Sequence, residues 1–263
     1  TTFVIITGGI DLSIGTGMTL AAVMTGIFIT KMGLPVWLGV LGGIATGVLM
    51  GFINGVNVAF LKLPPFIATL GMMMIAQGLA LVISGVAPIY FSSSAPDFKQ
   101  IALGTLIPGL PNAVLITIVL AFIAYLILNR TILGRYTFAI GSNEEATRLS
   151  GVNTRRWKVL IYMLAGAFTG IAGVVIASRL DSAQPQLGVG YELQAIAAVI
   201  IGGTSLLGGR GSILGTVIGA LIMSVLINGL RIMSIQTKWQ NVVVGIVILI
   251  AVFFDSLRNR QHT

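Results

Sequence analysis

Long apolar runs alternate with short polar or glycine-rich segments along the whole chain. A helix needs roughly 20 predominantly apolar residues to cross the hydrocarbon core of a bilayer. On this pattern we predict eight membrane spans, at residues 18–30, 36–60, 65–84, 113–128, 159–178, 193–201, 213–230 and 242–254. Residues 3–10 look like the end of a further span, so we expect other membrane helices of the protein to precede Thr1.

The composition strengthens this interpretation. Hydrophobic residues make up 56% of the chain and charged residues only 8%, whereas soluble domains carry roughly 25% charged residues. We therefore predict an all-α integral membrane protein, a polytopic helical bundle that forms one transmembrane domain over residues 1–263. The formal net charge is +8, but the basic residues lie between apolar runs and form no stripe for nucleic acid. The chain has no cysteine, which excludes disulfides and thiolate metal sites.

The placement of Lys and Arg predicts which loops face the cytoplasm. Basic residues concentrate in cytoplasmic loops, and a cytoplasmic C-terminus places ten of the 15 basic residues on that side. The segment 86–111 then lies outside the cell membrane, because it is too polar and too rich in Pro and Ser to cross. Its residues Ser92, Ser93 and Ser94 are typical of surface turns.

Glycines recur at every fourth residue in several of the predicted spans. The two longest sets are Gly43, Gly47, Gly51 and Gly55 in one span and Gly211, Gly215 and Gly219 near the start of another. Small residues at this spacing form faces on which helix backbones approach one another closely. We interpret both sets as packing surfaces, in preference to surfaces on which helices slide.

Residues suited to catalysis are nearly absent. The one histidine is His262, close to the C-terminus. The glycine-rich segment 202–212 lacks the Gly-Lys-Ser/Thr ending with which a phosphate loop holds phosphate and magnesium, so we interpret it as a tight turn between two helices. We predict that this chain has no catalytic residue, binds no metal or cofactor, and does not hydrolyse ATP by itself.

The seven acidic residues lie at span ends or in loops. Ion-coupled transporters commonly place acidic residues inside spans, so this distribution disfavours ion coupling. The most informative acid is Asp11, in the sequence GGIDLSIG. Either Asp11 or Ser13 caps the helix that follows, or the glycines break a helix that lines a pathway. We favour capping, and the two interpretations are compatible.

Few polar side chains lie in or beside the predicted spans. The candidates for a translocation path are Asp11, Ser13, Asn54, Asn57 and Gln77. Each can hydrogen-bond a neighbouring helix or a hydroxylated solute. Asn54 and Asn57 lie near the glycine face of their helix, which favours bonding between helices.

The largest predicted cytoplasmic segment spans residues 129–158. Ser142 or Asn143 can cap a short helix with Glu144 in its first turn, where a carboxylate is favourable. Arg148 lies four residues after Glu144, at the spacing of a helical ion pair, and Gly151 is placed to end the helix. A short, capped helix of mixed charge suits the docking of a soluble partner, although an ordinary structured loop fits these residues equally well.

Several long motifs closely resemble the permease subunits of bacterial ribose-type sugar ABC importers. They are GGIDLSIG, LPPFIATLGMMMI, GRYTFAIGSNEEATRLSGVNTRRWK, ASRLDSAQP, GYELQAIAAVIIGGTSLLGGRGSILGT and AVFFD. The match runs in order through nearly all 263 residues; the ASRLDSAQP motif carries one serine more than the family pattern.

This resemblance implies a permease subunit in the bacterial cytoplasmic (inner) membrane. Its expected partners are cytoplasmic ATP-binding cassette subunits that hold ATP and magnesium, a periplasmic or surface sugar-binding protein, and a second permease copy. The family's ATPase-coupling helix maps onto Gly141, Asn143, Glu144, Glu145, Ala146, Arg148, Leu149, Ser150 and Gly151. The alternatives are an ion-coupled secondary transporter or channel for a small polar solute, and a membrane scaffold that transports nothing.

Overall fold

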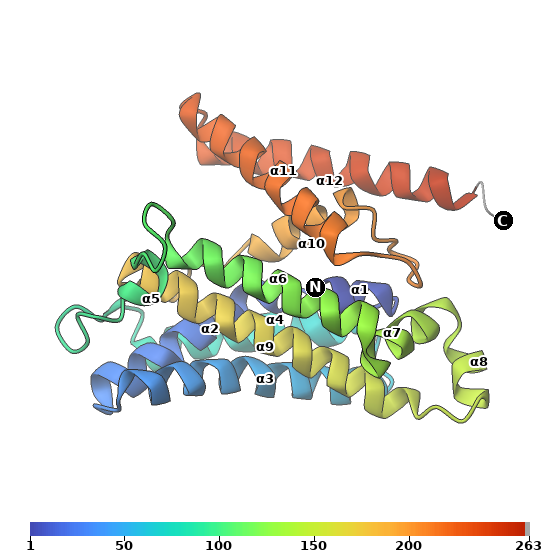
Figure 1. The fold of residues 1–263 in the computed structure, drawn as a ribbon, viewed down its shortest axis with the longest axis horizontal. Coiled ribbons are helices and arrows are strands. Elements are labelled where there is room, and N and C mark those ends of the chain that lie inside the picture. Colours follow the sequence, from blue (N-terminus) through green and yellow to red (C-terminus); the bar gives the residue numbers. More distant parts are fainter. Residues whose placement is uncertain (261–263) are drawn as a thin grey trace. The chain divides into compact units, whose positions relative to one another are not determined.

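The computed structural model describes the backbone of residues 1–260 and the side chains of residues 1–253. The described chain is mostly helical (Figure 1). The elements of the first half are α1 (Thr2–Ile6), α2 (Ile14–Gly26), η1 (Ile27–Lys31), α3 (Val36–Ala59), α4 (Pro65–Ser84), β1 (Ile89–Tyr90), α5 (Gln100–Leu103) and α6 (Asn112–Arg130). Those of the second half are α7 (Ile132–Ser142), α8 (Glu144–Leu149), α9 (Thr154–Leu180), β2 (Ser182–Ala183), α10 (Tyr191–Ile201), α11 (Ile213–Ile232) and α12 (Thr237–Arg260).

The predicted spans are confirmed as helices. Among the described residues, six helical segments are long and apolar enough to cross a membrane: Ile14–Lys31, Val36–Ala59, Pro65–Ser84, Asn112–Arg130, Thr154–Leu180 and Ile213–Ile232. The other two predicted spans coincide with the shorter apolar helices Tyr191–Ile201 and Thr237–Phe253. The segment Ile14–Lys31 ends in a π-helical turn, η1, where the Met32 amide bonds the Ile27 carbonyl five residues back.

The chain divides into two compact units. Unit 1 comprises Thr1–Ile10, Ile123–Thr154 and Leu193–Thr263, and unit 2 comprises Asp11–Phe122 and Arg155–Glu192. Helix α6 begins in unit 2 and ends in unit 1. The prediction of one transmembrane domain over residues 1–263 stays a prediction, and each unit is described below by itself.

Unit 2 is built on a close crossing of α3 and α9. A Cβ added to Gly47 of α3 would overlap the Gly166 carbonyl and lie 2.7 Å from the Gly170 nitrogen, both on α9. One turn later, Gly51 meets the backbone of Tyr162 in the same way. One turn before Gly47, Gly43 faces α2, where an added Cβ would lie 3.0 Å from the Ala21 carbonyl oxygen. The glycines therefore allow the α3 backbone to touch its neighbours directly.

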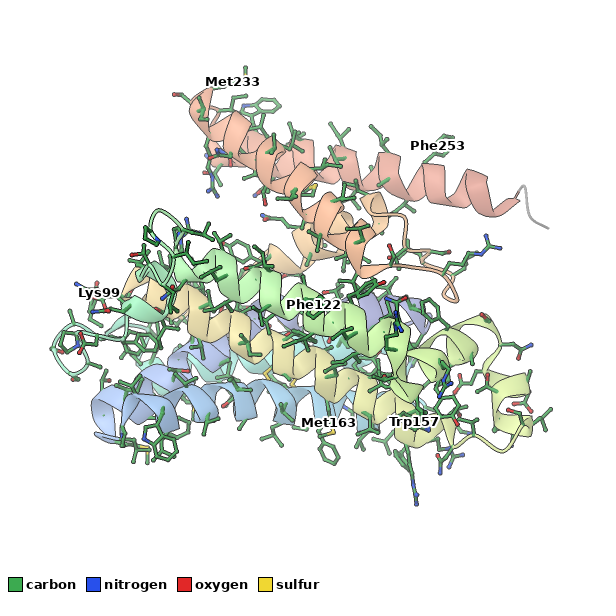
Figure 2. All side chains as sticks on the ribbon, viewed as in Figure 1. Lys99, Phe122, Trp157, Met163, Met233 and Phe253 are labelled. Carbon is green, nitrogen blue, oxygen red and sulfur yellow. The ribbon has the colours of Figure 1, made fainter. Side chains whose placement is uncertain are left out.

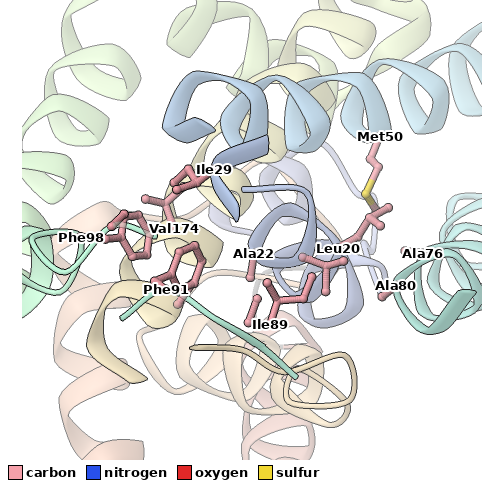
Figure 3. Packing of buried hydrophobic residues seen from close by; sticks show 14 of the residues in the cluster. Leu20, Ala22, Ile29, Met50, Ala76, Ala80, Ile89, Phe91, Phe98 and Val174 are labelled. Atoms are coloured by element: carbon pink, nitrogen blue, oxygen red, sulfur yellow. The ribbon is translucent and has the colours of Figure 1, made fainter. Parts of the chain in front are cut away.

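The segment between α4 and α6 is more ordered than the predicted external loop of turns. Phe91 and Phe98 are fully buried, and their rings stack with centroids 4.1 Å apart. Figure 3 shows these rings beside Ile29 and Val174, within the main apolar cluster of unit 2. Strands β1 and β2 pair antiparallel, with Ile89 opposite Ala183. Ser92, Ser93 and Ser94 lie exposed in a turn, as predicted.

Hydrogen bonds fix this folded segment to α9. The Ser178 hydroxyl donates to the Phe98 carbonyl at 2.7 Å and accepts from the Ala102 amide at 3.0 Å. The elements in this segment are too short for a pattern of polar and apolar residues to predict this packing from the sequence.

Unit 1 has its own small-residue contacts. A Cβ on Gly215 or Gly219 of α11 would overlap the carbonyls of Gly202 and Ala198, respectively. The N-cap of α11 is Ser212, whose hydroxyl accepts a hydrogen bond from the Gly215 amide at 3.0 Å. Residues 202–212 form the turn between α10 and α11 that the sequence predicted, with Gly203, Gly208 and Gly209 at positive φ.

Large apolar side chains remain exposed on both units. Figure 2 labels Phe122, Met233 and Phe253, which are exposed by 60%, 72% and 59%. Water-soluble monomers rarely expose contiguous apolar surface on this scale. Contact with lipid or with other membrane subunits accounts for it.

Candidate functional site

Helix α8 has a complete N-terminal cap. Asn143 is the cap residue, and its Oδ1 accepts a hydrogen bond from the Ala146 amide at 2.9 Å. Of the two caps left open by the sequence, Asn143 is therefore the one used. Glu144 and Glu145 occupy the first turn, where their charges complement the positive end of the helix dipole.

The C-terminal end of α8 is closed locally as well. The Ser150 amide bonds the Ala146 carbonyl at 3.0 Å, and the Gly151 amide bonds the Arg148 carbonyl at 3.1 Å. Gly151 has φ +88°, in the left-handed region where glycine is favoured. The helix thus ends where the sequence predicted, with Ser150 as the C-cap residue.

The ion pair on α8 differs from the predicted one. Arg148 bonds Glu145, three residues before it, through Nε to Oε2 at 3.1 Å and through Nη2 to Oε1. The predicted partner was Glu144, four residues before Arg148. The hydrogen bond from Arg148 lowers the pKa of the exposed Glu145 carboxyl below its ordinary value, and the same bond raises the pKa of Arg148.

Most of α8 faces away from the rest of unit 1. Only Thr147 is buried, and its hydroxyl donates to the Asn143 carbonyl at 2.8 Å. Leu149 is 74% exposed. An exposed leucine beside an exposed carboxylate–guanidinium pair offers a partner both apolar and charged contacts.

Helix α7, which the sequence analysis did not predict, directly precedes α8 and connects it to the rest of unit 1. Its N-cap is Thr131, whose hydroxyl accepts a hydrogen bond from the Gly134 amide, and only Asn143 separates its last residue, Ser142, from α8 (Figure 1). Gly141, assigned by resemblance to the coupling helix, lies in the last turn of α7. A Cβ there would overlap the Ile6 carbonyl and lie 2.6 Å from the Gly209 nitrogen. Gly141 is therefore a packing residue within unit 1.

A second group of predicted residues meets in unit 2. Asp11 Oδ1 accepts two hydrogen bonds from Ser13, from its amide at 2.9 Å and its hydroxyl at 2.7 Å. The Ser13 hydroxyl accepts from Asn54 Nδ2 of α3 at 2.9 Å. All three residues are at most 3% exposed. The bond from Asn54 joins two elements, as its position near the glycine face favoured.

The capping prediction for this region is wrong in one respect. Ser13 occupies the N-cap position of α2, but no side chain there accepts a cap hydrogen bond. The Asp11 carboxylate instead closes a turn onto Ser13, ahead of the helix. Thr69 of α4 joins the cluster, because its hydroxyl accepts from the Leu12 amide at 3.2 Å. Nothing in the spacing of Leu12 and Thr69, 57 residues apart, predicts this contact.

Three buried polar atoms in unit 2 have no hydrogen-bond partner among the described residues: Asn54 Oδ1, the Tyr162 hydroxyl and Asp181 Oδ1. Asn54 and Tyr162 are each 1% exposed. Unpaired buried polar atoms commonly bind water. The sequence analysis missed Tyr162, because an aromatic residue in an apolar helix carries no distinguishing signal. Asn57 and Gln77 are half-buried and lie outside the hydrogen-bonded cluster.

Apolar helices of membrane-spanning length, with a short, exposed and capped helix among them, are the features of a polytopic membrane protein. Comparison with known families is in agreement. The chain belongs to the family described as branched-chain amino acid transport system / permease component, whose pattern matches residues 1–252.

The chain is also similar to curated sugar import permeases. It is 42% identical over 261 residues to the ribose import permease protein of Escherichia coli (strain K12), covering 97% of this chain and 79% of that protein. It is 46% identical over 255 residues to the ribose import permease protein of Bacillus subtilis (strain 168), covering 97% and 78%. For the fructose import permease protein of Rhizobium meliloti the identity is 40% over 261 residues, covering 97% and 72%. No solved structure matches the chain significantly.

Proposed function

We propose that this chain is the membrane-spanning permease subunit of an ATP-binding cassette importer that carries a ribose-like monosaccharide into the cytoplasm. The observation that carries the proposal is similarity over 97% of the chain to ribose and fructose import permeases. The subunit resides in the cytoplasmic membrane with its C-terminus inside. A separate subunit binds ATP and magnesium and hydrolyses the ATP.

The ATPase subunit docks on α8. Three properties of the helix support this assignment: its ends are capped by its own residues, its surface is exposed, and its glycine neighbour Gly141 packs against the body of unit 1. Closure of the nucleotide-bound ATPase would move α8 and bias the permease between two conformations, which is the minimum requirement for alternating access.

The complete importer contains further partners. A periplasmic or surface binding protein delivers the sugar, and a second copy of the permease completes the membrane pathway. Asp11, Ser13, Asn54, Asn57 and Gln77 are the proposed path residues. The unpaired Asn54 Oδ1 supports a role for that residue in contacting hydroxyl groups.

Reconstituted transport tests this function. Proteoliposomes containing the permease and its ATPase, with binding protein outside, should accumulate labelled ribose only when ATP and magnesium are enclosed. Unlabelled fructose, allose and leucine serve as competitors, because the family description includes amino acid transport. Competition by leucine but by none of the sugars would refute monosaccharide transport.

The alternative class is an ion-coupled transporter or channel. It predicts uptake by the permease alone under a proton or sodium gradient. Such uptake, unchanged when the ATPase is omitted, would overturn the proposal.

Charge reversal on α8 tests the docking assignment. Replacing Glu144 and Glu145 together with lysine should abolish both uptake and copurification of the ATPase, while the permease keeps its unfolding midpoint. Asp97→Lys is the control, because Asp97 is an exposed acid in a different segment. Normal transport by the double variant would show that these carboxylates do not dock the ATPase.

A further inference from the structure

Three segments of unit 1 meet at the carbonyl of Ile6, the last residue of α1. The Gly209 amide donates a hydrogen bond to this carbonyl at 2.8 Å. Gly141 of α7 lies against the same carbonyl with no space for a Cβ. A Cβ on Gly208 would lie within 3.0 Å of the Gly141 carbonyl, the Gly8 nitrogen and the Ile6 carbonyl. We call Gly141, Gly208 and Gly209 the glycine joint.

Helix α1 is tied to this part of the chain at its other end as well. The hydroxyls of Thr2 and Thr216 are 2.9 Å apart, which links the first residue of α1 to α11. Both ends of α1 therefore bond the region formed by the 202–212 turn and the start of α11. A helix of five residues held at both ends moves with the elements that hold it.

The joint is connected directly to α8. The Asn143 amide bonds the Ala139 carbonyl of α7 at 3.0 Å, and the Asn143 side chain caps α8. One residue thus belongs to the end of α7 and the start of α8. A displacement of α8 must therefore displace the last turn of α7, where Gly141 lies.

We propose that the glycine joint is a rigid connection through which a displacement of α8 is carried to α1. This inference rests on the proposed function, in which the ATPase moves α8. Beyond α1 the chain passes through Gly8, at φ +76°, and Gly9 to Asp11. The joint accordingly delivers the movement to the glycine break that precedes the proposed path residues.

Backbone contact explains why glycine is required at the joint. Side chains can change rotamer and absorb a small displacement, whereas backbone atoms in direct contact cannot. Closely packed interiors transmit such displacements, and chains of packed contacts of this kind can carry coupling between distant sites. Gly141 and Gly208 act as positioning residues: they touch neither nucleotide nor sugar.

Gly141→Ala tests the joint, with Gly78→Ala in α4 as control because a Cβ there has nothing within 4 Å. In the reconstituted importer, Gly141→Ala should keep ATPase copurification and basal ATP hydrolysis while uptake falls about tenfold, within the usual range of allosteric coupling. Gly78→Ala should leave all three unchanged. Uptake by Gly141→Ala at the wild-type rate would overturn the inference.

The same experiment separates failure of the joint from failure of the proposed function. If the wild-type permease transports without its ATPase, the proposed function fails. If wild-type transport requires the ATPase and Gly141→Ala still transports normally, only the joint is refuted.

A disulfide provides a second test that leaves the glycines intact. The chain has no cysteine, so Thr2→Cys combined with Thr216→Cys introduces the only pair. If α1 and α11 move together as one rigid body, the oxidised and reduced forms should show equal uptake. If oxidation stops uptake and reduction restores it, α1 separates from α11 during transport and the inference is wrong. This test can overturn the inference even if Gly141→Ala fails to fold.

Discussion

A methyl group on Gly47 should disrupt the crossing of α3 and α9. The added Cβ would lie 2.7 Å from the Gly170 nitrogen and 2.9 Å from its Cα. Non-bonded carbon atoms normally approach to about 3.5–4.0 Å, so the helices must separate by about 1 Å. The hydrogen-bonding groups of both backbones stay satisfied within their own helices, and the cost is therefore one of packing.

The size of this effect follows from a matched comparison. Overpacking by a methyl group costs about 1–3 kcal/mol. Gly71→Ala in α4 places the same methyl group where nothing lies within 4 Å. Because glycine is the poorer helix former, Gly71→Ala should stabilise the protein by between zero and about 1 kcal/mol. The two substitutions should thus shift the free energy of unfolding in opposite directions.

Equilibrium unfolding in mixed micelles of a mild detergent and SDS can measure this difference. Tryptophan fluorescence provides the signal, since Trp157 lies in α9. The Gly47→Ala midpoint should fall to lower SDS, and the Gly71→Ala midpoint should stay or rise. Equal shifts for the two variants would refute the inferred backbone contact between α3 and α9.

Two further predictions concern buried and capping hydrogen bonds. Ser13→Ala removes the hydroxyl that bonds both Asp11 and Asn54, and it should cost about 2–4 kcal/mol in the same unfolding assay. Ser84→Ala, whose hydroxyl bonds only within its own helix, should cost about 0.5–1.5 kcal/mol; equal effects would contradict the cluster. Asn143→Ala removes the α8 cap and should cost about 1 kcal/mol. Titration with fluorescent ATPase should then show roughly fivefold weaker binding, while Asn143→Asp retains affinity, and unchanged binding by the alanine variant would count against the cap's role in docking.

The sequence was informative where local physics decides the structure. Apolar run length identified the spans, because in a bilayer the backbone groups of each span must be satisfied within its own helix. The α8 helix was equally predictable, since Asn143, the first-turn acids and Gly151 each act through neighbours within a few residues. The long motif resemblance added the proposed ATPase-coupling role of that helix, which its residues alone left open.

Contacts between distant residues could not be predicted in the same way. Asp11 or Ser13 was expected to cap α2, but the structure of this turn also involves Asn54, which bonds Ser13, and Thr69, which bonds Leu12, and both come from other helices. Phe91 and Phe98 lie in a polar segment and are buried by α9 and η1. The Ile6 carbonyl at the glycine joint belongs to the backbone, so the types of side chains in the sequence do not predict its contacts.

Both ends of α8 are capped by residues of the same segment, and this has a thermodynamic consequence for any partner that binds the helix. Ordering the backbone of one residue costs about 1–2 kcal/mol of conformational entropy, so folding a six-residue helix on contact would oppose association by several kcal/mol. Hydrogen bonds within the segment order α8 before the partner binds, so this entropy is not lost on binding. The residues that make these bonds are Asn143, Thr147, Ser150 and Gly151. Binding to α8 can therefore proceed as the meeting of two preformed surfaces, with little of the interaction free energy lost to folding.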